Sequence, residues 1–229
     1  MIAIAKILKS IDLSEEKQLK KYGFGLIIDP NISSFNVPLI LQQISSILNP
    51  VPIQLIKDCG IKTLQIRDLG PCKQVYPNHG YYSCIGNLIA LNSQIFIDPD
   101  QPKDFCGEKG CITRAAETLY HELGHGYDSI HGDLSFKPEW LKISGWSKEY
   151  KPGLKRLLIK ETGTKPIVGE WFFDPKAEFV RFYAKKCPED DWADSFGYYV
   201  AQLIKDKIPA PKITYFDALL NKYYSDLID

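Results

Sequence analysis

A helix with two unlike faces is the strongest structural signal in this sequence. Apolar residues recur every three or four positions, as they do along one face of an α-helix, at Ile112, Ala116, Leu119, Leu123, Tyr127 and Ile130. His121 and His125 point away from this stripe and, being four residues apart, project from one face about one turn apart. The sequence therefore predicts a helix from about 112 to 129 that packs by one face and presents two histidines on another.

Two imidazoles one helical turn apart are suited to binding a single zinc ion. Glu122 follows the first histidine, where its carboxylate can reach a metal-bound water without being a ligand, so the stretch has the His-Glu-x-x-His signature of metalloproteases. The alternative is that these residues form only a hydrated helix face. The sequence has only four histidines, and finding two of them in this spacing favours the metal site.

Composition narrows the classes of partner. Lys plus Arg equal Asp plus Glu at 28 each, so no overall positive field attracts nucleic acid or an anionic membrane. No apolar run approaches the roughly 20 residues of a transmembrane helix, and lysines interrupt the N-terminal stretch too early for a secretory signal. We expect a soluble, monomeric chain without nucleic-acid or membrane partners, folded as one domain over 1–229 with a sheet lobe at about 23–130 and a helical lobe at about 131–229.

The six cysteines leave the redox state open. None forms a Cys-x-x-Cys pair, which argues against a thiolate zinc knuckle or a thioredoxin-type redox site. Cys106 and Cys111 bracket a turn-rich loop that a disulfide could close. Either all six are reduced core thiols, or one or more disulfides form in an exported protein without a recognisable signal peptide. We favour the second slightly.

A small sheet is predicted ahead of the histidine helix. An amphipathic helix over 37–48 precedes a strand over 61–67, and two further strands are expected over 81–91 and 94–97. In zinc peptidases a sheet edge beside this helix commonly holds the substrate backbone, because unpaired strand N–H and C=O groups bind any extended peptide. The strand over 81–91 is our candidate for that edge.

The second half is predicted to be mostly helical. Asp174 and Pro175 supply the cap and first position of a helix running to about 186, and a second helix starts at Pro188, with acids in its first turn. A last helix is expected over about 212–227. We expect an α+β chain similar to the zincin-like metalloproteases, with a small mixed sheet packed on the active-site helix and a helical half after it.

A catalytic zinc usually takes three protein ligands, and two candidates compete for the third place. His131 follows His121 by ten residues, which is the metzincin spacing. That class has a glycine where this chain has Asp128, and it has a methionine turn, whereas the only methionine here is Met1. We therefore favour the second candidate, a carboxylate from a later helix.

The segment Pro188–Phe196, Pro-Glu-Asp-Asp-Trp-Ala-Asp-Ser-Phe, carries a family resemblance. It resembles the motif Glu-Asp-Phe-Ala-Glu-x-Phe of the anthrax lethal factor and Pro-Pro endopeptidase superfamily, in which the glutamate after alanine is the third zinc ligand. When the two are aligned by Ala193 and Phe196, that ligand falls on Asp194. Aspartate is shorter than glutamate by one methylene, so the helix must approach the metal more closely.

Two more stretches share the resemblance, His-Glu-Leu-Gly-His-Gly-Tyr-Asp over 121–128 and Phe-Val-Arg-Phe-Tyr-Ala over 179–184. In the order of elements it covers about 37–204. It implies a gluzincin-like zinc endopeptidase that acts on a protein or peptide and has a tyrosine to stabilise the oxyanion. Tyr183 is the best candidate for that tyrosine, with Tyr198 and Tyr199 as rivals.

The sequence thus predicts Zn²⁺ held by His121, His125 and Asp194, with Glu122 as general base and acid. Asp128 is a candidate for orienting a ligand histidine. Two other classes stay open, a catalytically inactive binding domain of the same fold and an interaction protein with a structural zinc. The first should have lost Glu122, and the second needs a fourth ligand that the spacing of the cysteines does not supply.

Overall fold

The computed structural model describes residues 19–69, 79–97, 112–156, 158–159, 167–168, 170–202 and 205–224. The first part of the chain contains a four-stranded sheet in the order β1-β2-β4-β3, formed by β1 (Gly25–Ile28), β2 (Thr63–Arg67), β3 (Gly80–Ser83) and β4 (Leu88–Asn92). Strands β1, β2 and β4 run parallel, while β3 pairs antiparallel with β4. The sheet is therefore mixed, and β3 is one of its edges.

Four helices accompany this sheet: α3 (Val37–Leu48), α4 (Ile53–Asp58), α5 (Gln94–Ile97) and α6 (Arg114–Ile130). Helix α3 has Pro38 in its first turn and buries one face, including Ile40 and Ile44. The longest of the four, α6, begins at Thr113, whose side chain accepts a hydrogen bond from the N–H of Ala116 at 3.2 Å.

The second part is mostly helical, with short strands between the helices. Its helices are η1 (Leu134–Phe136), α7 (Pro138–Ser144), η2 (Tyr183–Lys185), α8 (Pro188–Ala201), η3 (Lys205–Lys207), α9 (Ala210–Leu220) and η4 (Asn221–Tyr223). Its strands form two antiparallel pairs, β5 (Trp146–Ser147) with β8 (Phe172–Phe173) and β6 (Leu158–Ile159) with β7 (Ile167–Val168). Within the described ranges, no helix is long and apolar enough to cross a membrane.

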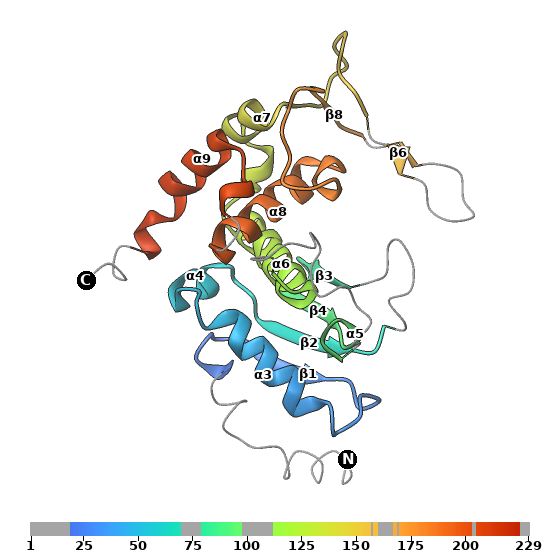
Figure 1. Cartoon of the computed structure of the whole chain (residues 1–229), viewed down its shortest axis with the longest axis vertical. Coiled ribbons are helices and arrows are strands. Elements are labelled where there is room, and N and C mark those ends of the chain that lie inside the picture. Colours follow the sequence, from blue (N-terminus) through green and yellow to red (C-terminus); the bar gives the residue numbers. More distant parts are fainter. Residues whose placement is uncertain are drawn as a thin grey trace.

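Helix α6 lies in the middle of the molecule, with the sheet on one side and α8 on the other (Figure 1). Leu119, Leu123 and Tyr127 of its predicted stripe are at most 2% exposed and belong to the core, although Ile130 at its end is 48% exposed. The opposite face is buried as well, because α8 covers it. The α+β architecture predicted from the sequence, with a small mixed sheet packed on the histidine helix and a helical C-terminal part, is confirmed.

Several predicted elements are confirmed and others are wrong. The helix over 37–48, the strand at 61–67 and the helices beginning near 112 and at 188 are present, and the last helix begins at Ala210 and ends earlier than expected. The predicted single strand over 81–91 is a hairpin instead. Gly86 and Asn87 adopt positive φ angles of 87° and 50°, which turn the chain so that Tyr82 faces Ile89 across the pair.

Two further predictions fail because of local turns. Residues 94–97 form the short helix α5, since the Asn92 side chain accepts the N–H of Gln94 at 3.1 Å and turns the chain before the apolar run. The helix predicted from Asp174 is also missing. The Asp174 carboxylate accepts the N–H of Lys176 at 2.8 Å in a local turn, and regular structure resumes only at η2.

Candidate metal and catalytic site

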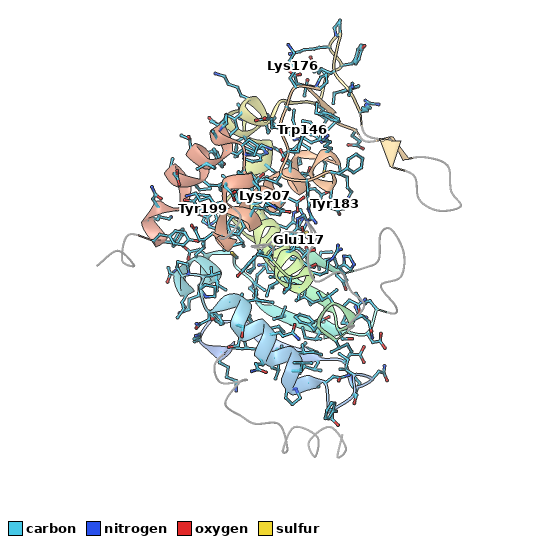
Figure 2. The ribbon with its side chains drawn as sticks, viewed as in Figure 1. Glu117, Trp146, Lys176, Tyr183, Tyr199 and Lys207 are labelled. Atoms are coloured by element: carbon cyan, nitrogen blue, oxygen red, sulfur yellow. The ribbon has the colours of Figure 1, made fainter. Side chains whose placement is uncertain are left out.

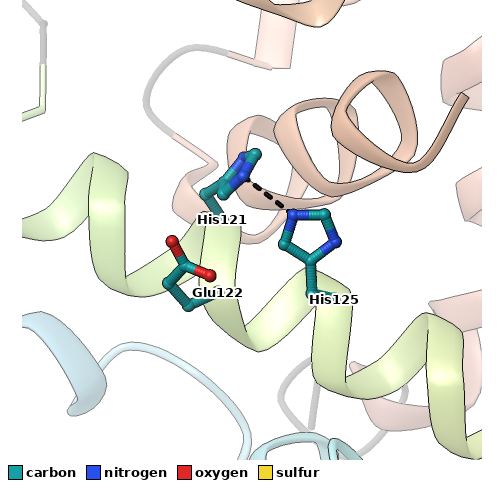
Figure 3. Close-up of side chains that lie close together, drawn as sticks. All are labelled: His121, Glu122 and His125. Atoms are coloured by element: carbon teal, nitrogen blue, oxygen red, sulfur yellow. Dashed lines mark hydrogen bonds between the residues drawn. The ribbon is translucent and has the colours of Figure 1, made fainter. Parts of the chain in front are cut away.

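Helix α6 holds the three signature residues together in a buried position. His121 and Glu122 are each 6% exposed, and His125 is half-buried. Ligand atoms of the three lie within 4.8 Å of one another, and the two histidine Nε2 atoms are 3.0 Å apart (Figure 3). The predicted pairing of the two histidines on one face of the helix, with Glu122 close to them, is therefore present.

Helix α8 approaches this face of α6 with almost no space between the backbones. A Cβ placed on Gly124 would lie 2.9 Å from the Cα and 3.0 Å from the carbonyl oxygen of Ala193. A Cβ on Gly197 would lie 3.3 Å from the backbone of Tyr120 and His121. Glycine at both positions lets the helices meet closely, and this contact brings the carboxylates of α8 to the histidines.

Asp190, in the first turn of α8, is the carboxylate that faces the two Nε2 atoms. Its Oδ1 lies 3.5 Å from the Nε2 of His121 and 3.5 Å from the Nε2 of His125. The other oxygen, Oδ2, accepts from the Lys186 ammonium at 3.0 Å and from the Cys187 thiol at 3.1 Å. Asp190 is 4% exposed, so its side chain belongs to the buried site rather than to a solvated helix cap.

These three atoms fit the requirements of a zinc ion. Tetrahedral zinc with bonds of about 2.0–2.2 Å to nitrogen and oxygen needs ligand atoms roughly 3.3 Å apart. The observed separations are 3.0 Å between the nitrogens and 3.5 Å from each nitrogen to the carboxylate oxygen. Two imidazoles and one carboxylate also make a donor set used by catalytic zinc.

Asp194, which the sequence predicts as the third ligand, lies on the opposite side of the His121 ring. Its Oδ1 is 2.6 Å from Nδ1 of His121, and it accepts two hydrogen bonds from the Arg181 guanidinium, of which Nε to Oδ2 measures 2.7 Å. A second-sphere carboxylate on Nδ1 fixes the ring and leaves Nε2 for the metal. The resemblance assigns metal binding to Asp194, whereas this geometry favours Asp190 for that role.

Arg181 joins the two helices at this point. Besides Asp194 on α8, it binds Glu117 of α6, with Nη1 and Oε1 3.0 Å apart. The arginine side chain is 14% exposed and the two carboxylates are at most 3% exposed, so the three charges form a buried cluster. The Arg181 guanidinium also lies 5.1 Å from the centre of the Tyr183 ring.

The charges of the site shift several pKa values. Burial alone would raise the pKa of Asp190, but His121, His125 and the Lys186 ammonium hold it well below its usual range. For Asp194, burial is likewise outweighed by Arg181 and His121, so its pKa is also lowered. Burial would lower the pKa of His121, yet the Asp194 and Asp190 carboxylates raise it to about 10. Both aspartates are thus kept as anions beside the histidines.

Tyr183, the predicted oxyanion donor, lies beside His121. Its ring packs edge-on against the His121 ring, with centroids 5.8 Å apart, and its hydroxyl accepts from Lys186 at 3.3 Å. Burial and the nearby Asp190 raise its pKa to about 12, so the hydroxyl keeps its proton at neutral pH.

The hydroxyl groups of the two rival tyrosines already donate to carboxylates. The hydroxyl of Tyr198 donates to Glu117 at 3.3 Å, and that of Tyr199 donates to Asp217 of α9 at 2.7 Å. In Figure 2 Tyr183 lies close to Glu117 near the middle of the molecule, and Tyr199 lies farther to the left. Of the three tyrosines, Tyr183 alone packs on a signature histidine.

The side chains of His131 and Asp128 make their hydrogen bonds away from the two Nε2 atoms. The His131 ring stacks on Tyr127 with centroids 4.0 Å apart, and its Nε2 lies 3.2 Å from the carbonyl oxygen of Asp58. The Asp128 carboxylate accepts from the N–H and the hydroxyl of Ser135, each at 2.7 Å. The hydrogen bonds of these two side chains thus go to Asp58 and Ser135 and not to His121 or His125.

The edge of the sheet beside α6 is β3, only part of the predicted strand over 81–91. Gly80 packs against α6 so closely that an added Cβ would lie 2.9 Å from the Thr118 side chain. Strand β4, the other part, lies inside the sheet between β2 and β3. The predicted substrate-binding edge is therefore reduced to Gly80–Ser83.

Sequence reasoning missed Asp190, Arg181, Glu117 and Lys186 as residues of the site. The one available signal was that Asp190 and Asp194 are four apart, which places both on one face of α8. Among the described cysteines, Cys59, Cys84 and Cys187 are free thiols. Cys72, Cys106 and Cys111 lie outside the described residues, and so does the disulfide considered for the last two.

No family model matches the chain, and no curated protein matches it in sequence. Among solved structures, the chain is similar to a protein from Bacteroides caccae that is provisionally described as a zinc-binding metallopeptidase. The two are 17% identical, the match covers 93% of this chain and 85% of that chain, and the TM-score is 0.44. A likeness at this level assigns no function, so any function has to follow from the side chains of the site.

Proposed function

We propose that the chain is a zinc-dependent endopeptidase. The observation that carries the proposal is the convergence of the Nε2 atoms of His121 and His125 and the Oδ1 atom of Asp190 at 3.0–3.5 Å, with Glu122 beside them on the same helix. Two neutral imidazole ligands and one carboxylate would leave the fourth coordination position of a tetrahedral zinc ion open. An open position distinguishes catalytic zinc sites from closed structural ones.

His121, His125 and Asp190 would hold the metal. Asp194 then supports the site from outside, by fixing the His121 ring through Nδ1. This assignment replaces the expectation that Asp194 itself is the ligand. It also removes the need for α8 to approach still more closely, because Asp190 already faces both Nε2 atoms.

Zinc, when bound here, would polarise the scissile carbonyl and make water acidic enough to act as a nucleophile near neutral pH. Glu122 accepts the proton of the attacking water and later delivers it to the leaving amine. Tyr183, which keeps its proton, donates a hydrogen bond to the carbonyl oxygen as negative charge develops there.

The substrate class is a protein or peptide bound in extended form. The outer edge of β3, next to α6, offers backbone N–H and C=O groups that pair with a peptide whatever its side chains. A peptide paired with this edge of β3 would run beside α6, and its scissile bond would cross the face of α6 that carries Glu122.

Cleavage of a peptide library by the wild type and by Glu122→Gln tests the proposal. The substitution keeps the shape of the side chain and removes the base, so we expect activity to fall by at least about 100-fold with zinc content and fold unchanged. Glu149→Gln, at an exposed position, is the matched control and should keep full activity. Equal activity of wild type and Glu122→Gln contradicts the mechanism, and a zinc-bound wild type that cleaves nothing favours the inactive binding domain.

A further inference from the structure

Lys186 makes two contacts that the mechanism above does not use. It lies between η2 and α8, and its Nζ is 3.0 Å from Oδ2 of Asp190 and 3.3 Å from the hydroxyl of Tyr183. The ammonium also lies 5.2 Å from the centre of the Tyr183 ring. One side chain thus touches both the proposed carboxylate ligand and the proposed oxyanion donor.

The chemistry of an ammonium group fixes the direction of both hydrogen bonds. Because Lys186 has only donors, the Tyr183 oxygen must accept from it, and the phenolic proton remains free to donate to another acceptor. Asp190 accepts from Lys186 and Cys187 through Oδ2. This leaves Oδ1 of Asp190 facing the two Nε2 atoms, so the carboxylate is set up to bind a metal through one oxygen.

The side chain reaches these groups from the surface. Lys186 is 42% exposed, whereas the Asp190 side chain is 6% exposed. Replacing it therefore opens no large cavity, which separates its effect on the site from a general loss of packing. Its neighbour Lys185 offers a matched control, since its Nζ lies over the rings of Phe179 and Phe182 instead.

We propose that Lys186 is a positioning residue, which orients Asp190 for metal binding and Tyr183 for hydrogen-bond donation to the substrate carbonyl. The proposal rests on the proposed zinc peptidase function and adds to it a residue outside the signature motif. An ion pair that served stability alone would leave zinc affinity, kcat and KM as they are.

The test compares Lys186→Met, Lys186→Arg and Lys185→Met. Zinc affinity is measured by competition with a chromogenic chelator, and kcat and KM are measured on one peptide substrate. For Lys186→Met we expect zinc affinity to fall about 10-fold, as for loss of other outer-sphere partners, and kcat to fall about 10-fold with KM changed less than about twofold. Lys186→Arg should keep part of the zinc affinity and part of the kcat that Lys186→Met loses. Lys185→Met should match the wild type in both.

A double substitution separates the two contacts. In the Tyr183→Phe background the loss of kcat on Lys186→Met should be smaller than in the wild type, because the part transmitted through the hydroxyl is already gone. Unchanged zinc affinity and kcat in Lys186→Met overturn the proposal, as does an equal loss in Lys185→Met. If the wild type binds zinc but cleaves no peptide, the peptidase function fails while the affinity measurement still tests the contact with Asp190. A wild type that binds no zinc overturns both.

Discussion

Gly124 of α6 faces Ala193 of α8 so closely that a Cβ on the glycine would lie 2.9 Å from the Cα of the alanine. This contact lies between the histidines of α6 and the carboxylates at positions 190 and 194 of α8. Because Gly124 has no side chain, the two helices can approach this closely. Their separation in turn sets the distance from Asp190 to both Nε2 atoms.

Gly124→Ala should therefore weaken zinc binding as well as stability. The added methyl meets backbone atoms that cannot rotate away, and overpacking of this kind typically costs about 1–3 kcal/mol. Chemical denaturation and zinc competition together measure both effects. Gly197→Ala is the graded control, because its Cβ would lie 3.3 Å from the nearest backbone and should cost less. Equal effects of the two substitutions would show that the contact at Gly124 does not set the helix separation.

Asp190→Ala and Asp194→Ala should differ in their effect on the metal. Removal of Asp190 deletes a proposed ligand and should reduce zinc affinity by well over 100-fold, whereas removal of Asp194 deletes an outer-sphere partner, for which about 10–100-fold is typical. Zinc retained by purified protein and chelator competition both report the difference. A greater loss in Asp194→Ala would restore the assignment made from the sequence.

Arg181→Met should destabilise the metal-free protein. The substitution removes the guanidinium that the buried carboxylates of Glu117 and Asp194 share, and loss of one partner of a buried pair costs about 3–5 kcal/mol. Urea denaturation in the presence of chelator measures it. Arg156→Met, whose arginine is exposed over the Phe172 ring, is the control and should cost less than about 1 kcal/mol. Adding Glu117→Gln to Arg181→Met should recover part of the lost free energy of unfolding. If Arg181→Met loses no more stability than Arg156→Met, the buried charge cluster does not stabilise the protein as proposed.

His79, next to β3, should make stability depend on pH. Burial, and then the charges of Arg114 and Arg181, lower its pKa to about 4, below the value of about 6.5 in an unfolded chain. Between these values the unfolded state binds a proton that the folded state does not, so stability is complete above about pH 6.5 and is lost as the pH falls toward 4.

The comparison with His79→Gln isolates this contribution. After allowing for solvent screening of a partly exposed group, we expect the wild type to lose about 1 kcal/mol more than the variant between about pH 7.5 and pH 5. Unfolding free energies in chelator at both pH values measure the difference. Parallel pH profiles would show that His79 titrates alike in the folded and unfolded chains.

The sequence was informative where structure depends on local pattern. The stripe through Leu119 and Leu123 and the spacing of His121 and His125 are properties of a single helix, so they predict α6 and its paired imidazoles directly. The helix over 37–48 was predicted for the same reason. The turn at Gly86 and Asn87 was missed, although a Gly-Asn pair between two strand-like runs is a hairpin signal.

Choosing between Asp190 and Asp194 required information that local pattern does not hold. Both face α6, and which one meets Nε2 depends on how α8 crosses that helix. From the sequence, the acidic residues at 189–191 were explained by the helix dipole alone, and specific contacts of two of them were therefore missed. Asp190 faces the histidines, and Asp191 is buried against Lys212 of α9 at 2.6 Å.

Arg181 shows the same limit in the segment before α8. Its position within a predicted helix gave no hint of a role, because its partners Glu117 and Asp194 belong to two other elements. The segment follows these long-range contacts and forms only the single turn η2. Propensity is a weak guide where charged tertiary contacts of this kind decide the backbone.

Anomalous scattering at the zinc absorption edge, from crystals grown with zinc, tests the proposed site most directly. We predict one strong peak about 2.0–2.2 Å from Nε2 of His121, Nε2 of His125 and Oδ1 of Asp190, with Asp194 remaining on Nδ1 of His121. A peak that is bound to Asp194 or His131 in place of Asp190, or no peak at the two histidines, would contradict the site.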